Sequence, residues 1–182
     1  MKLVREHISF ERPSSSDDFK RKLKVGKIVQ IEKWFDDLDI SSEEYTIDKD
    51  FNINVRKDLD LYGTKITSLP DNLSVGGNLN LEETKIISLP NVLSVGGDLY
   101  LNNEITSLPN VLSVGGDLDL EGIEIISLSN VLSVGGWLDL RGTKITSLPD
   151  NLSVGGWLDL RGTKITSLPD NLKVKGKIYK DF

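Results

Sequence analysis

Several chemically versatile residue types are scarce or missing in this chain. Its 182 residues include no cysteine and only one histidine, His7. Without cysteine there is no disulfide, no thiolate metal site and no cysteine nucleophile. His7 has no partner motif around it, so no Ser-His-Asp set can be assembled there with any specificity. These absences favour a non-enzymatic protein that uses neither a cofactor nor a metal.

Long hydrophobic runs are missing as well. No stretch approaches the roughly 18 apolar residues that a membrane-spanning helix needs. The first residues, MKLVREHISFERP, alternate charged and apolar side chains and lack the apolar run of a signal peptide. We therefore expect a cytoplasmic protein that has no membrane partner.

Basic residues are too few to balance the acidic ones in most of the chain. The net charge is -6; residues 1–57 hold 12 Lys and Arg against 12 Asp and Glu, whereas residues 58–182 hold 10 against 16. Nucleic-acid binding depends on neutralising phosphates with basic side chains, so this excess argues against a nucleic-acid partner. It suits a basic protein partner, or it serves solubility alone.

What the chain does have is an internal repeat. The phrase WLDLRGTKITSLPDNL occurs at residues 137–152 and again at 157–172. Aligned backwards, the phrase defines six units, which we call coils 1 to 6: 58–77, 78–97, 98–116, 117–136, 137–156 and 157–176. Coil 3 is one residue shorter than the others, and a partial unit follows coil 6. A period near twenty residues indicates a solenoid, in which each coil buries its apolar face against its neighbours.

Each coil predicts one short strand. In coil 2 and the residues before it, VGGNLNL alternates with period two, so Val75, Leu79 and Leu81 are expected to face the core. The glycine pair is expected to form a corner that leads into the strand. The later LPDNL-type segment is expected to be extended or turn-like because proline cannot donate to a ladder. We expect strands near 78–81, 98–101, 117–120, 137–140 and 157–160, all in a single parallel sheet.

The repeated pattern LxLxxTxIxSLPxxL resembles the short bacterial type of leucine-rich repeat, in which units read LxVxxNxLxxLP. The resemblance covers about two thirds of the chain. It implies that threonine hydroxyls replace the usual buried asparagine side chains, at Thr64, Thr84, Thr143 and Thr163. The ligase effectors that carry such repeats use a catalytic cysteine in a further domain, and this chain has neither. The resemblance therefore implies the fold without that enzymatic role.

The segment before the repeats has a different character. SSSDDFKRKLKVG predicts a basic helical stretch that closes at Gly26, and KIVQIEKWFDDLDI places Ile28, Ile31, Phe35 and Leu38 at helical spacing. YTIDKDFNINV predicts one or two strands. Residues 1–50 are expected to cap the open end of the solenoid formed by residues 51–182, or to offer a second contact surface around Trp34. This arrangement is similar to uncharacterised leucine-rich-repeat proteins of large bacteriophages, which implies a viral setting.

The predicted fold class is thus α+β: a leucine-rich-repeat solenoid with one parallel β-sheet and extended or turn-like back segments, preceded by a small helical and strand capping module. Equivalent outward positions on neighbouring strands form columns, because strands lie about 4.8 Å apart. One column includes Trp137 and Trp157, and the next ones bring aspartates, tyrosines and arginines beside them, with Asn102 in the same column as the arginines. The candidate binding residues on this inner face are Trp137, Trp157, Arg141, Arg161, Asp139, Asp159, Asp119, Tyr100 and Tyr179.

Exposed tryptophan, tyrosine and arginine are typical of protein interfaces. The pattern therefore favours a protein-binding scaffold whose partner is another protein, and the phage resemblance implies an inhibitor that blocks a host or bacterial defence protein. Two other interpretations stay open. The tryptophan rings could pack on each other for stability, or the chain could be a structural, self-assembling part of a virion.

Overall fold

The computed structural model describes residues 16–182, so His7 lies outside the described residues. The chain divides into two compact units, one ending at Ile40 and the other running from Ser41 to Phe182. Within residues 16–182, no helix combines the length and the apolar character needed to cross a membrane.

The first unit contains one long helix, α1 (Ser16–Asp36). Gly26 does not end it, so the prediction of a separate basic segment closing at Gly26 is wrong. A glycine inside a helix costs about 1 kcal/mol relative to alanine, and the lysine, arginine, leucine, glutamine and glutamate residues elsewhere in α1 favour the helix enough for it to continue through Gly26. The predicted apolar stripe is confirmed for Ile31 and Phe35, which are buried, and for Ile28, which is half-buried, whereas Leu38 lies beyond the end of the helix.

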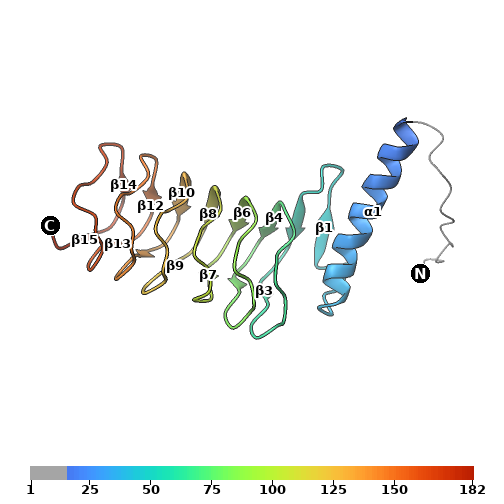
Figure 1. Cartoon of the computed structure of the whole chain (residues 1–182), viewed down its shortest axis with the longest axis horizontal. Helices are drawn as coiled ribbons and strands as arrows, with labels where there is room; N and C mark the ends of the chain where they lie inside the picture. The colour runs from blue at the N-terminus through green and yellow to red at the C-terminus, as the bar shows by residue number, and fades with distance from the viewer. Residues whose placement is uncertain (1–15) are drawn as a thin grey trace. The chain divides into compact units, whose positions relative to one another are not determined.

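The second unit is a parallel β-solenoid with a period of about twenty residues (Figure 1). It forms two sheets, which we call sheet A and sheet B. Sheet A has eight strands: β1 (Tyr45–Ile47), β2 (Ile53–Val55), β4 (Leu73–Val75), β6 (Val92–Val95), β8 (Val111–Val114), β10 (Val131–Val134), β12 (Ser153–Val154) and β14 (Lys173–Val174). Sheet B has seven: β3 (Leu59–Asp60), β5 (Leu79–Asn80), β7 (Leu99–Tyr100), β9 (Leu118–Asp119), β11 (Leu138–Asp139), β13 (Leu158–Asp159) and β15 (Ile178–Tyr179).

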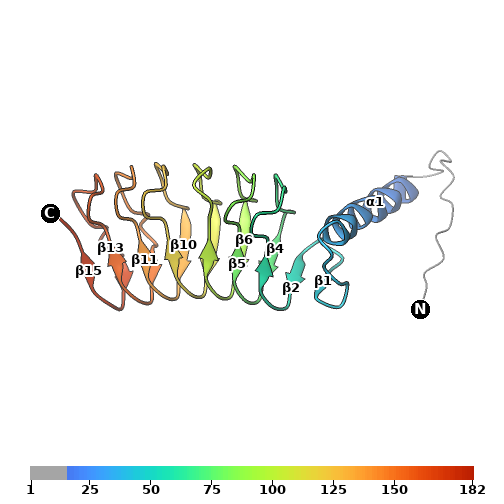
Figure 2. The same ribbon diagram turned by 90° about the horizontal axis from the view of Figure 1, so that it is seen from below.

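The fold class is confirmed in its main features, and the strands expected near residues 78–81 and at the equivalent places are those of sheet B. The expectation of a single parallel sheet is wrong, because the segment before each glycine pair forms strands of its own. Those strands stack in register, for example Leu73 beside Leu93 and Val75 beside Val95. Figure 2 shows the successive coils side by side in one row. The return segments of residues 58–182 contain no helix, as expected.

The glycine pair marks the corner between the two sheets. A Cβ atom added to Gly96 would lie 2.2 Å from the carbonyl oxygen of Gly76 in the preceding coil. Real Cβ atoms do not approach backbone that closely, so a larger residue would push the two coils apart at this corner. The glycine is therefore required by the close approach of neighbouring backbones.

One strand closes an edge of sheet A in a different way from the rest. β1 pairs antiparallel with β2, with Tyr45 opposite Val55 and Ile47 opposite Ile53. All the other strand pairs of the two sheets within residues 41–182 are parallel. The predicted strands in YTIDKDFNINV are confirmed, and the first of them covers the edge strand β2 of sheet A.

The core repeats from coil to coil. Leu73, Val75, Leu79, Leu81 and Ile86 are all buried, and their equivalents in coils 3 to 5 are buried as well. Alternate residues in each strand point out, as the period-two pattern predicts.

Threonine hydroxyls make the buried turn hydrogen bonds that the repeat pattern implied. Thr84 Oγ1 donates to the carbonyl oxygen of Leu81 at 2.7 Å, and Thr143 Oγ1 donates to that of Leu140 at 2.8 Å. Thr64 and Thr163 make the same contact in their own coils. Each hydroxyl satisfies a carbonyl group at the turn that follows sheet B.

Candidate functional site

The nine candidate residues lie on or next to the strands of sheet B, on the side that points away from the core. We call this outward side the sheet B face. The most exposed aromatic side chains among the nine are Trp157 at 58%, Tyr100 at 42% and Trp137 at 37%. Asp139 is only 6% exposed, so it is positioned to hold a neighbour rather than to meet a partner itself.

The residues that precede the strands form a ladder of side-chain hydrogen bonds. Asp58 Oδ1 accepts from the backbone amide of Asn78 at 2.8 Å, and Asn78 Oδ1 accepts from that of Asp98 at 2.7 Å. Asp98 in turn accepts from Asp117, and Asp117 accepts from Trp137, each at 2.8 Å. These acidic and amide side chains therefore have a structural role, since each one ties its own coil to the next.

Room for this ladder comes from the second glycine of each pair. A Cβ atom on Gly97 would lie 2.1 Å from Asn78 Oδ1, and one on Gly116 would lie 2.0 Å from Asp98 Oδ1. The sequence contains a signal for the ladder. Asp or Asn precedes a strand in coils 1 to 4, and a glycine pair always comes one period later.

The ladder ends at coil 5, where tryptophan replaces Asp or Asn at the position before the strand. Trp137 donates its backbone amide to Asp117, but an indole ring has no acceptor with which to continue to Trp157. Coils 5 and 6 thus give up a stabilising side chain in favour of a large aromatic one. Neither indole ring can replace the lost hydrogen bond to the next coil.

Where it is Asp or Asn, the second residue of a sheet B strand caps the turn that follows. Asp119 Oδ1 accepts from the backbone amide of Glu121 at 2.9 Å, and Asp139 Oδ1 accepts from that of Arg141 at 3.0 Å. Asp159 makes the same contact with Arg161. The aspartates of this column therefore shape the turns as well as charging the face.

Arg141 connects three coils through its guanidinium group. Its Nη2 atom lies 2.7 Å from Glu121 Oε2 and 2.6 Å from Asp139 Oδ2, and its Nε atom lies 3.8 Å from Asp159 Oδ2. The hydrogen bond to Asp139 raises the pKa of Arg141 further above its ordinary value. Arg141 is therefore always charged, and it offsets the repulsion between the aspartates of neighbouring strands.

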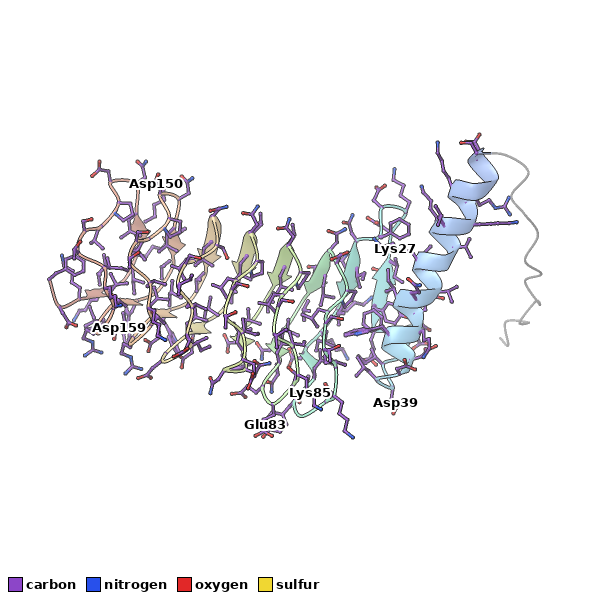
Figure 3. The ribbon with its side chains drawn as sticks, viewed as in Figure 1. Lys27, Asp39, Glu83, Lys85, Asp150 and Asp159 are labelled. Atoms are coloured by element: carbon purple, nitrogen blue, oxygen red, sulfur yellow. The ribbon has the colours of Figure 1, made fainter. Side chains whose placement is uncertain are left out.

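Arg161 belongs to a second cluster at the end of the solenoid. Its Nε atom donates to Asp159 Oδ1 at 2.9 Å, and this contact lowers the pKa of Asp159 below its ordinary value. Its guanidinium carbon lies 5.4 Å from the ring centroid of Tyr179, within the range of a cation–π contact. The Trp157 ring meets the same tyrosine edge-on at 6.2 Å. Asp159 lies at this end of sheet B, whereas Asp150, which belongs to coil 5, lies at the opposite edge of the solenoid (Figure 3).

Asn102 is not on the surface as the column alignment predicted. It is buried, and its side-chain amide donates to Thr84 Oγ1 at 3.0 Å and to the Ile86 carbonyl oxygen at 2.9 Å. Its Oδ1 atom accepts from the backbone amide of Glu104 at 2.8 Å. Coil 3 lacks one turn residue, so Asn102 fills the place that threonine occupies in coil 2.

A hollow of about 480 Å³ lies on the sheet B face where Asn102 turns inward. We call it the coil 3 hollow. It is lined by residues of coils 2 to 5: Glu82, Asp98, Leu99, Tyr100, Leu101, Asn103, Asp117, Asp119, Glu121, Ile123 and Trp137. Tyr100 Oη donates to Asp98 Oδ2 at 3.0 Å, and this hydrogen bond raises the pKa of Tyr100. The hollow thus combines five carboxylates with two aromatic rings.

Three carboxylates come close enough together to be considered as metal ligands. Oxygen atoms of Asp119, Glu121 and Asp139 lie within 4.8 Å of one another. Arg141 forms ion pairs with both Glu121 and Asp139, so its guanidinium already neutralises two of the three. These residues fit an internal ion-pair network better than a cation site.

Comparisons with known proteins add no relative. No family model, curated protein or solved structure matches this chain. The arrangement on the sheet B face is therefore the basis for assigning a function, and what it offers chemically is recognition: a rigid surface with exposed aromatic rings, two arginines held by carboxylates, and one acidic hollow.

Proposed function

We propose that this chain is a non-enzymatic, protein-binding scaffold of the leucine-rich-repeat type, and that its sheet B face is the binding surface. One observation carries the proposal. Trp137 and Trp157 are exposed on a face whose other coils use the same position for the stabilising Asp and Asn ladder. A large, exposed apolar ring at a position where other coils use a stabilising polar group is best explained by a partner that covers it.

The neighbouring residues support this proposal. Tryptophan, tyrosine and arginine contribute most to binding energy in protein interfaces. Arg141 and Arg161 are held in place by Asp139 and Asp159, so binding would cost less side-chain entropy than it would for free arginines. The strands beneath are fixed by a continuous buried core, so the face is preorganised.

Blocking a surface of the partner is the simplest mechanism for a scaffold without catalytic groups. In the bacteriophage setting that the sequence resemblance implies, the partner would be a host protein or a bacterial defence protein. The acidic excess of the repeats favours a partner with a basic surface, because complementary charge speeds association.

A photo-crosslinking experiment tests the proposal. A photoreactive phenylalanine analogue replaces Tyr100 or, in a second variant, Trp157, and a control variant carries it at Ile126, which is 68% exposed in a return segment. We expect one specific product in a bacterial lysate from the two face positions, suppressed by excess unlabelled protein, and none from position 126. Equal labelling from all three positions would contradict the proposal. A crosslinked second copy of this chain would instead support a self-assembling structural role.

A further inference from the structure

We infer that the coil 3 hollow is a pocket for a lysine or arginine side chain of the protein partner. This inference rests on the proposed function and specifies the chemistry that the sheet B face recognises. It has three independent supports: the gap in the face, the charge that lines the gap, and the apolar and aromatic groups that line it as well.

The gap exists because one side chain is missing from a regular column. After each sheet B strand, coils 2, 4 and 5 present Glu82, Glu121 and Arg141 outward. In coil 3 the equivalent residue is Asn102, which is buried. β7 and β9 also pair at a single position, Leu99 with Leu118, whereas the neighbouring pairs β5–β7 and β9–β11 pair at two. The missing side chain and the shorter pairing together open the face between Glu82 and Glu121.

The charge around this gap is one-sided. Five carboxylates line it, and no lysine or arginine is among the lining residues. Among residues 16–182, the one ion pair that these five form with a basic side chain is that of Glu121 with Arg141. The other four leave an uncompensated negative field, which a low-dielectric cleft focuses on an incoming cation.

The hollow also has apolar groups that suit the aliphatic stem of a long basic side chain. Leu99, Leu101 and Ile123 are among the residues that line it. Tyr100 and Trp137 contribute exposed aromatic rings on either side of coil 4. Lysine and arginine characteristically place their methylene groups on apolar surface and their charge near carboxylates, and aromatic faces attract the cation further.

A hydrated metal ion fits this hollow less well. Metal ions need several free oxygen ligands that converge at one point. Asp98 and Asp117 each use one oxygen atom in the backbone ladder, and Asp119 uses one at its turn. The combination of carboxylates with aromatic and aliphatic walls is instead the chemistry that recognises an organic cation.

The test uses the full chain and a small probe, the capped tripeptide acetyl-Gly-Arg-Gly-amide, with acetyl-Gly-Glu-Gly-amide as the charge-reversed comparison. NMR titration follows the indole N–H of Trp137 and the backbone amides of residues 98–104 and 117–123. We expect saturable shifts with the arginine peptide only. Shifts that are absent, or that appear equally with the glutamate peptide, would overturn the inference.

Two matched double variants separate the hollow from general charge attraction. Glu82→Gln/Glu121→Gln removes two carboxylates from the hollow, one free and one paired with Arg141. Glu104→Gln/Glu124→Gln removes the same charge outside it, and Glu124 is likewise paired, with Lys144. We expect the first variant to bind the arginine peptide about fivefold more weakly, as one lost ion pair on the order of 1 kcal/mol implies. Equal affinities in the two variants would overturn the inference.

A loop exchange provides a variant that keeps the net charge of the wild type. Replacing Asn102–Glu104 with Glu-Glu-Thr-Lys, the turn of coil 2, restores the twenty-residue length and should fill the gap. Unchanged melting with lost peptide binding supports the pocket, and retained peptide binding contradicts it. If the exchanged chain fails to fold, the glutamine variants decide. A calcium titration completes the set, since micromolar calcium binding that displaces the peptide would reassign the hollow to a metal ion.

Failure of this inference can be distinguished from failure of the proposed function. If the photo-crosslinked partner binds the Glu82→Gln/Glu121→Gln variant as tightly as the wild type, the hollow is not a recognition pocket although the sheet B face still is. If position-specific crosslinking fails while the arginine peptide binds, the pocket stands and the proposed protein-binding function falls.

Discussion

The side-chain amide of Asn102 donates a hydrogen bond to the hydroxyl of Thr84, in the preceding coil, at 3.0 Å. The same hydroxyl donates to Leu81. One asparagine thereby links the turns of coils 2 and 3, and its burial leaves the sheet B face open above it. Asn102 thus stabilises coil 3, the shortest coil, through its buried hydrogen bonds. Because its side chain is buried, no side chain from this position covers the sheet B face.

Replacing Asn102 with alanine should destabilise the solenoid by about 2 kcal/mol, because buried partners would lose their hydrogen bonds and a small cavity would form. Asn103→Ala is the control, since Asn103 is exposed in the same turn. Urea unfolding followed by circular dichroism measures both. Equal unfolding midpoints for the two variants would show that the Asn102 contacts contribute nothing.

Gly96→Ala should be more damaging than Gly63→Ala. The first places a Cβ atom 2.2 Å from the Gly76 carbonyl oxygen, where two coils would have to separate. The second meets open space and only strains a left-handed backbone with φ of 66°, at a cost on the order of 1 kcal/mol. We expect a loss of about 3 kcal/mol or more for Gly96→Ala. Thermal melts that place Gly63→Ala below Gly96→Ala would contradict the role assigned to the corner.

Ser129→Pro should stabilise the protein by about 0.5 to 1 kcal/mol. Ser129 occupies the position at which five other coils have proline, and its buried Oγ atom has no hydrogen-bond partner. Proline would remove that unsatisfied group and reduce the freedom of the unfolded chain. The reciprocal change, Pro109→Ser, should lower the melting temperature. A lower melting temperature for Ser129→Pro would mean that coil 4 requires a different backbone path.

Truncation should locate the cap. A chain starting at Ser41 keeps β1, which covers the β2 edge of sheet A, and should unfold cooperatively as a monomer. A chain starting at Phe51 loses β1 together with the buried Tyr45, and it exposes an unpaired strand, so we expect aggregation. Light scattering and calorimetry compare the two. If the shorter chain behaves as well as the longer one, β1 is dispensable and the cap lies elsewhere.

Much of this fold could be predicted because each repeat of the sequence forms one coil of the solenoid. The alternation around Leu79 and Leu81 and the hydroxyl of Thr84 follow from spacing and from the resemblance to leucine-rich repeats. The second sheet was missed for a physical reason. Its strands are two to four residues long and most of them follow a proline-containing turn, so the segment from Leu73 to Val75 also suits an irregular extended path.

The site was predictable in its residue types but not in its shape. The columns containing Trp137 and Arg141 follow from the repeat alone. The inward position of Asn102 depends on how the backbone of coil 3 adjusts to having one residue fewer. An alignment of the repeats does not show whether the side chain of Asn102 then points into the turn or out to the surface. The Asp58-to-Trp137 ladder depends on pairing between coils, and so it appears only when the backbone amides are in place.

The affinity of the crosslinked partner for a Trp137→Ala/Trp157→Ala variant tests the central claim most directly. Isothermal titration calorimetry gives that affinity, with Ile87→Ala/Ile126→Ala as the control that removes two exposed apolar side chains elsewhere. We predict that the tryptophan variant loses about thirtyfold or more in affinity, as the loss of a central interface anchor does. Its unfolding free energy should stay within about 1 kcal/mol of the wild type, and the isoleucine variant should bind normally. A tryptophan variant that melts early and binds with wild-type affinity would contradict the account, because the rings would then belong to the scaffold and the partner would use another face.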